Sequence, residues 1–394
     1  MVNDDPIVIV SCARTPIGNF QGVFKNTTAP ELGAVAIKAA LERAQLKPEM
    51  IHEVLMGCVL PAGLGQAPAR QAALGAGLLN STGCTTVNKM CGSGMKTVML
   101  AHDALLADSE NIIIAGGMES MTHAPYLLPK ARAGYRLGHQ TVVDHMLYDG
   151  LEDAYQKGSL MGVFAEECAE QYYFTREAQD QFAITSVLRA KQAQVEGSFD
   201  GEIAPVVVTS KQGETLISAD EGPGSAQIEK IPQLKPAFRK DGTVTAANAS
   251  SISDGAAALV LMRRSEAERL GLTPLATMVG HQTHAQEPNL FTTAPIGAIQ
   301  KLLRAIHWSV DDVDLYEINE AFAVVTMAAM HDLQLPHEKV NVHGGACVLG
   351  HPIGASGARI LVTLLYALKK YDLKRGVAAL CIGGGEATAV AVEL

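Results

Sequence analysis

Aromatic residues, long apolar runs and excess basic charge are all scarce in this chain of 394 residues. Only 5% of the residues are aromatic, and one is a tryptophan. No uninterrupted apolar run approaches the ~18 residues that a membrane-spanning helix needs. The formal net charge is -10, and an acidic chain is a poor non-specific ligand for nucleic acid. We therefore expect neither membrane nor nucleic-acid partners.

A disulfide scaffold is also absent. The seven cysteines are an odd and widely scattered set, which predicts reduced thiols. The first residues carry Asp4 and Asp5 where a secretion or transit signal carries basic charge, so we expect a cytoplasmic protein. Because the chain is acidic, an anionic ligand would need a local positive patch. One candidate patch consists of Lys230, Lys235, Arg239 and Lys240. The alternative interpretation is that these residues form an ordinary solvated charged face.

The abundant features are small and aliphatic residues, with 37 glycines and 48% hydrophobic residues. Short apolar runs at residues 7–11, 54–56, 85–87 and 111–115 alternate with segments of helical spacing such as 32–44. Strands that alternate with helices indicate a layered α/β fold. A chain of this length also favours more than one domain.

The second half of the chain repeats the order of the first, which predicts an internal duplication. Coincidence of common α/β turns is the alternative. The matched segments, in order, are 7–11 with 275–280, 51–57 with 313–319, 91–96 with 354–359, and 112–117 with 377–385.

A segment of different character separates the halves. It contains a charged helix at 175–196, with Thr175 as a plausible N-cap and an apolar stripe of Phe182, Val187 and Ala190. We expect a first half at 1–118, completed by about 249–270, an inserted loop domain at 119–248, and a second half at 271–394.

Four residues are candidates for chemistry. Cys91 lies between a predicted strand and a predicted helix, where free N–H groups stabilise a thiolate, and glycines after it allow close approach of a ligand. His351, in a Gly-His-Pro loop, could deprotonate a thiol. Cys381 precedes a glycine run whose N–H groups could stabilise an oxyanion, and Asn319 could orient a water.

Each candidate also has a structural explanation, as a small buried thiol, a packed histidine or a turn-forming asparagine. His343, Cys347 and His351 lie four residues apart, and on one helix they would suggest zinc. The intervening glycines and Pro352 disfavour such a helix. The predicted duplication places the four candidates at related positions, so we expect them to meet in one crevice.

Seven motifs in this order resemble the thiolase family over essentially the whole chain. They are VNKMCGSG at 87–94, GGMESM at 116–121, NAS at 248–250, DGAA at 254–257, NEAF at 319–322, GHPIGASG at 350–357 and CIGGG at 381–385. The resemblance implies two duplicated βαβαβαββ halves stacked as an αβαβα sandwich, with an inserted loop domain that covers a coenzyme A site. It implies no metal and no resident cofactor, because coenzyme A thioesters are the substrates.

The resemblance also implies a ping-pong reaction. Cys91, activated by His351, would take up an acyl group, and Cys381 would remove an α-proton from a second acyl-CoA. His351 and a water held by Asn319 would stabilise the enolate, and the N–H groups of Cys91 and Gly383 the tetrahedral intermediate. Two acetyl-CoA would give acetoacetyl-CoA and CoA, and thiolysis of a 3-ketoacyl-CoA is the reverse.

The same resemblance indicates positions that bind substrate. It also shows three departures from relatives that bear on which acyl group the protein accepts. Leu160 stands where short-chain biosynthetic members carry histidine, Glu386 where an uncharged residue is frequent, and His343 where asparagine is frequent. The positions expected to contact substrate or CoA are Leu151, Met161, Phe238, Ala249, Ser250, Ala321 and Phe322.

Three other functions are alternatives to that of a biosynthetic thiolase. They are a degradative 3-ketoacyl-CoA thiolase of broader chain length, a condensing synthase of related fold, and a silent acyl-CoA-binding paralogue. Cys381 weighs against the synthase, and retention of all four candidate residues weighs against the silent paralogue. Residues 131–138 resemble the loop through which biosynthetic members form tetramers, so we expect a homotetramer, a dimer of dimers.

Overall fold

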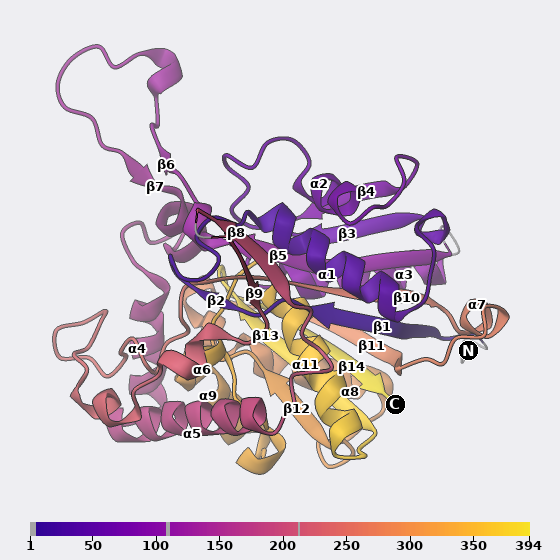
Figure 1. Cartoon of the computed structure of the whole chain (residues 1–394). Helices are drawn as coiled ribbons and strands as arrows, with labels where there is room; N and C mark the ends of the chain where they lie inside the picture. The colour runs from indigo at the N-terminus through magenta and orange to yellow at the C-terminus, as the bar shows by residue number, and fades with distance from the viewer. Residues whose placement is uncertain (1–4, 108–110, 212) are drawn as a thin grey trace.

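The elements of the first half include five strands and three helices that build the sandwich. The computed structural model describes residues 5–107, 111–211 and 213–394 (Figure 1). The strands are β1 (Ile7–Arg14), β3 (Glu53–Gly57), β4 (Gly83–Val87), β5 (Ile112–Ser120) and β10 (Ser253–Arg263). The helices are α1 (Ala29–Arg43), α2 (Pro68–Gly75) and α3 (Ser93–Leu106).

The second half repeats this arrangement, as the sequence predicts. Its strands are β11 (Ala276–Ala285), β12 (Leu315–Ile318), β13 (Arg375–Ile382) and β14 (Glu386–Glu393). Its helices are α8 (Ala294–Ile306), α9 (Ala323–Leu333) and α11 (Ser356–Lys370). The strand order β4-β3-β5-β10-β1-β11-β14-β13-β12 is symmetric about the antiparallel pair β1–β11. Within each half, parallel pairs lie at the outer edge and antiparallel pairs at the centre.

Alternate residues of each strand face different layers, because side chains in a strand point to opposite sides of the sheet. In β1, Ile7 and Ile9 pack with α3 and α11 in a central layer, whereas Val8 packs with α1 and α2. Helices α8 and α9 cover the outer face of the second half. The result is the predicted αβαβα sandwich, in which α3 and α11 pack against each other between the two halves of the sheet.

The segment between β5 and β10 forms separate small elements beside the sandwich (Figure 1). The predicted helix is confirmed as α5 (Arg176–Val195), capped by Thr175, whose Oγ1 accepts a hydrogen bond from Ala178 N at 3.2 Å. The other elements are β6 (Tyr126–Leu127), β7 (Val143–Asp144), α4 (Met161–Tyr172), β8 (Val206–Ser210), β9 (Gly213–Ile217) and α6 (Glu221–Ser225).

A buried ion-pair network attaches this segment to β1. The Arg14 guanidinium donates to Glu202 at 2.5 Å and to both carboxylate oxygens of Asp220 at 2.7 and 2.9 Å. All three side chains are fully buried, so removal of one would leave uncompensated charge. Across the described residues, no helix has the length and apolar character required to span a bilayer.

Candidate active site

A cavity of about 800 Å³ opens where the inserted segment meets the sandwich. Six of the seven predicted substrate positions line it: Leu151, Met161, Phe238, Ala249, Ser250 and Phe322. Ala321 does not, because its carbonyl is turned to accept a hydrogen bond from Ser250 N at 2.9 Å. Leu160 and Lys230 also line the cavity. Its walls are therefore mainly apolar, as expected of a small-molecule site.

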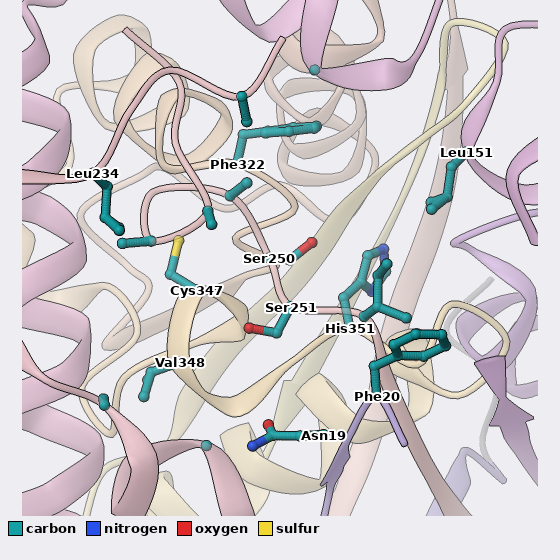
Figure 2. Close-up of a pocket in the computed structure, with 18 of the residues that line it drawn as sticks. Asn19, Phe20, Leu151, Leu234, Ser250, Ser251, Phe322, Cys347, Val348 and His351 are labelled. Carbon is teal, nitrogen blue, oxygen red and sulfur yellow. The ribbon is translucent and has the colours of Figure 1, made fainter. Parts of the chain in front are cut away.

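His351 projects into this cavity, near Phe20 and Leu151 in the view of Figure 2. Its backbone N–H donates to the Ser251 carbonyl at 3.0 Å, and its Nδ1 lies 2.5 Å from Ser356 Oγ. The single Ser356 hydroxyl proton is directed to the Pro352 carbonyl at 3.0 Å. Ser356 Oγ therefore accepts from Nδ1–H, which leaves Nε2 with a lone pair and no hydrogen-bond partner in the described structure.

Asn319 approaches the same histidine from the end of β12. Its Nδ2 lies 3.5 Å from His351 Nδ1, and its Oδ1 is buried without a protein partner. Its backbone N–H donates to Ala379 of β13 at 3.0 Å. Because Cys381 also lies in β13, this strand positions both Asn319 and Cys381. An unpaired buried oxygen is a suitable place for a water or a substrate group.

Cys91 occupies a strained turn between β4 and α3. Met90, just before it, has a φ of 47°, which is uncommon for a residue with a side chain. Asn88 Oδ1 accepts from Met90 N at 2.9 Å, and Ser93 Oγ donates to Met90 O at 2.6 Å. The backbone N–H groups of Gly383 and Cys91 hydrogen-bond to the Cys91 sulfur. The turn thus presents the thiol to two backbone donors.

The glycines after Cys91 have a packing role that the sequence alone does not indicate. A Cβ on Gly92 would lie 2.3 Å from Ile382 Cδ1, and one on Gly94 would lie 2.9 Å from Ala358 N. These glycines allow the Cys91 turn to pack against β13 and α11, and so bring the two halves of the molecule together. Close approach of a ligand at these glycines stays a prediction.

The expected thiolate at Cys91 is also not favoured in the free protein. Burial raises the pKa of Cys91 to about 11, although the Gly383 and Cys91 N–H groups oppose this. Burial raises the pKa of Cys381 as well, and negative charge on Cys91 raises it further. Burial lowers the pKa of His351 to about 3, with a contribution from Arg359. At neutral pH the site therefore holds neutral thiols beside a neutral imidazole.

Glu119 is a site-organising residue that the sequence reasoning left without a role. Its buried carboxylate accepts N–H groups of Val59 at 2.9 Å, Leu60 at 3.2 Å and Gly354 at 2.9 Å. It thereby joins the end of β5 to the loop that carries His351. Burial raises its pKa to about 7. The GGMESM motif was the available signal, although the partners of the carboxylate depend on the tertiary fold.

The continuous helix required for a zinc site through His343 does not form. The segment contains only the short α10 (Ala346–Leu349), between Gly344 and Gly350 with φ of 77° and 101°. His343 packs on Phe199 and Tyr371 and does not line the cavity.

The predicted positive patch is only partly at the cavity. Lys230 lines it, whereas Arg239 pairs with Glu167 and Glu170, and neither Lys235 nor Lys240 lines it. The patch is therefore not a single basic surface.

A duplicated α/β sandwich with two neighbouring thiols, and with a histidine that lines the cavity, defines the thiolase class of fold. Residues 7–265 match the thiolase N-terminal domain and residues 272–394 the thiolase C-terminal domain. Together these matches cover nearly the whole chain, and the chain belongs to the thiolase family.

Relatives of the chain match over almost their full length. An acetyl-CoA acetyltransferase of Cupriavidus necator is 50% identical over 98% of this chain and 99% of its own. Acetyl-CoA acetyltransferase 2 of Arabidopsis thaliana is 52% identical over 100% of this chain and 98% of its own length. A probable acetyl-CoA acyltransferase of Staphylococcus aureus is 46% identical over 98% of each chain.

Proposed function

We propose that the chain is an acyltransferase that condenses two acetyl-CoA molecules to acetoacetyl-CoA and CoA, and catalyses the reverse thiolysis. The relatives named above as acetyl-CoA acetyltransferases support this activity. The structural observation that carries it is a His351 imidazole at the cavity whose Nε2 has no partner, in a fold that also holds the Cys91 thiol against the Gly383 N–H. No resident cofactor is needed, because the CoA thioesters are themselves the substrates.

The first half-reaction transfers an acetyl group to Cys91. The Cys91 sulfur attacks the thioester carbonyl while its proton passes to His351 Nε2, and CoA leaves as a thiol with that proton. The N–H groups of Cys91 and Gly383 stabilise the oxyanion of the tetrahedral intermediate. A neutral imidazole suits this role, because its Nε2 is free to accept a proton at neutral pH.

The second half-reaction forms the carbon–carbon bond. Cys381, as a thiolate, takes an α-proton from a second acetyl-CoA, and the carbanion attacks the carbonyl of acetyl-Cys91. Cys91 leaves as a thiolate and receives this proton from Cys381. Solvent, which takes the thiol proton of Cys381 at the start of this half-reaction, returns a proton to Cys381, and both thiols are restored.

Asn319 and His351 complete the second step by stabilising the enolate oxygen. The unpaired Asn319 Oδ1 is suited to accept from a water that donates to the thioester oxygen, and His351 donates to that oxygen when its Nε2 carries a proton. The apolar lining that includes Leu151, Met161 and Phe322 would hold the acyl and pantetheine parts.

Acylation with acetyl-CoA followed by peptide mass spectrometry tests this proposal. We expect one acetyl thioester on Cys91, retained in Cys381→Ser and lost in His351→Ala. An unmodified Cys91 in the wild type would contradict the proposal. Thiolysis rates against 3-ketoacyl-CoA length then address the degradative alternative, which the names of the relatives do not favour. We expect a preference for four carbons with some tolerance beyond, because the apolar Leu160 lines the cavity where short-chain members carry histidine.

We propose further that the enzyme is a cytoplasmic homotetramer that acts in lipid metabolism. Residues 128–142 extend between β6 and β7 as an arm away from the sandwich (Figure 1). Leu137 on this arm is 93% exposed, and Leu128 is also exposed. Apolar side chains on such an extension gain burial only through contact with another chain.

A further inference from the structure

The Cys91 turn in the first half and the β13–β14 connection that follows Cys381 in the second half are joined by an ion pair. Lys89 is two residues before Cys91, and Glu386 begins β14, five residues after Cys381. The Lys89 ammonium pairs with the Glu386 carboxylate across 297 residues of sequence. The side chains are 22% and 34% exposed, so water screens this pair less than a fully exposed one.

Both ends of the pair stand on fixed backbone. Lys89 N donates to Ser93 Oγ at 2.8 Å, within the strained turn at Met90. Glu386 pairs with Ile382 and with Ala285 in the sheet. The ion pair therefore restrains the distance between two rigid segments, and it does not merely order two mobile loops.

The two segments also meet directly. Gly92 packs closely against Ile382, and the Gly383 N–H reaches the Cys91 sulfur. Gly384 and Gly385, with φ of 90° and 86°, form a turn that suits glycine. They have no side chain that could add to the contact between the two segments. A charged contact at the edge of this junction is well placed to keep the Gly383 donor in line.

We propose that Lys89 and Glu386 are positioning residues that hold the Cys91 turn against the Gly383 loop, and so set the geometry between the two sulfurs and their backbone donor. Neither side chain lines the cavity. The inference rests on the proposed function, since it concerns the step in which both cysteines act. Small errors in alignment between reacting groups lower rate strongly without weakening substrate binding.

Neutralising either partner tests the proposal. We expect Glu386→Gln and Lys89→Met each to lower kcat for acetoacetyl-CoA thiolysis about fivefold, with KM changed less than about twofold. The double variant should be no slower than either single variant, because both remove the same contact. Exchange of the charges in Lys89→Glu with Glu386→Lys should recover at least half of the loss. High salt should lower the wild-type kcat towards that of the variants.

A remote pair of similar exposure provides the control. Lys370 and Glu196 are 30% and 46% exposed and join α11 to the end of α5. Glu196→Gln should keep wild-type kcat. Wild-type kcat in both single variants, multiplicative losses in the double variant, or an equal loss in Glu196→Gln would overturn the proposal. Absent acylation of wild-type Cys91 by acetyl-CoA would instead show that the proposed function itself is wrong.

Discussion

The hydroxyl of Ser356 determines which nitrogen of His351 carries the proton. It accepts from Nδ1 at 2.5 Å and is itself held by the Pro352 carbonyl. Ser356→Ala removes this acceptor, so the imidazole loses its fixed tautomer and orientation. We expect kcat to fall about tenfold or more with little change in KM, measured by steady-state thiolysis.

Thr363 offers a matched control on the same helix. It is buried, and its hydroxyl donates to Glu202 at 3.2 Å, away from the cavity. Thr363→Val keeps the side-chain shape and should retain wild-type kcat. Equal rates for Ser356→Ala and the wild type would mean that Ser356 does not orient the histidine.

His343 makes the fold sensitive to acid. Burial and nearby Lys370 lower its pKa from 6.5 to about 4, and both ring nitrogens are buried without partners. The unfolded state therefore binds a proton more readily, so stability is lost as the pH falls from about 6.5 to about 4. Over that window the loss amounts to about 3 kcal/mol for this group.

We expect His343→Asn to flatten this pH dependence, measured as the free energy of urea unfolding at pH 7.5 and pH 5. The comparison of slopes separates the titration from any packing cost of the asparagine. His331→Asn, at an exposed histidine, should keep the wild-type slope. A wild-type slope in His343→Asn would contradict the assignment.

At the residue scale, the sequence predicts which side chains enter the site but not how they are tuned. Cys91, His351, Asn319 and Cys381 could be named because each lies in a short motif after a strand or before a helix. The high pKa of Cys91 could not be predicted, since it depends on burial by segments far away in sequence. The role of Glu119 is hidden for the same reason, because its N–H donors come from two other loops.

At the scale of elements, the contact between α3 and α11 fixes the site. A Cβ on Gly94 would lie 2.9 Å from Ala358 N, and one on Gly357 would lie 2.4 Å from Met95 N. The two helices thus approach each other through reciprocal glycines. Because the neighbours are backbone atoms, they cannot rotate away to relieve a clash.

Gly94→Ala should therefore destabilise the protein by about 2 kcal/mol or more and displace the Cys91 turn from its donors. Thermal unfolding and the Cys91 acylation rate measure the two effects. Gly224→Ala is the control, because a Cβ there meets nothing within 4 Å. Unchanged melting of Gly94→Ala would show that the helices can separate without cost.

The elements themselves were largely predictable, because apolar runs of period two and amphipathic helices leave clear patterns. The strand at 7–11 and the helix at 175–196 match β1 and α5 closely. The purpose of the glycines after Cys91 was not predictable. A glycine pattern fits both ligand approach and helix packing, and the packing on α11 depends on a partner that is distant in sequence.

At the scale of the whole molecule, neither half contains a complete site. Cys91 comes from the first half, whereas His351, Asn319 and Cys381 come from the second. The inserted segment adds cavity walls such as Met161 and Phe238. Duplication places equivalent strand ends beside each other, so two similar halves supply different chemical groups to one site.

The arm formed by residues 128–142 should govern assembly of whole molecules. Its exposed apolar residues have nothing to pack against in a single chain, although the Tyr135 hydroxyl bonds the Pro129 carbonyl and shapes the loop. Burial of such side chains between chains is favourable by about 25 cal/mol per Å². We therefore expect the wild type to have about four times the 41.6 kDa chain mass in light scattering at micromolar concentration.

Deletion of residues 131–138 should halve that mass, while acylation of Cys91 continues because none of these residues lines the cavity. Leu137→Asp should act in the same direction, since it places a charge on a side chain that is 93% exposed in the single chain. Leu216→Asp, at an exposed apolar residue of β9, is the matched control and should keep the larger mass. A wild-type mass of two chains would refute the role of the arm, because there would be no tetramer for it to hold.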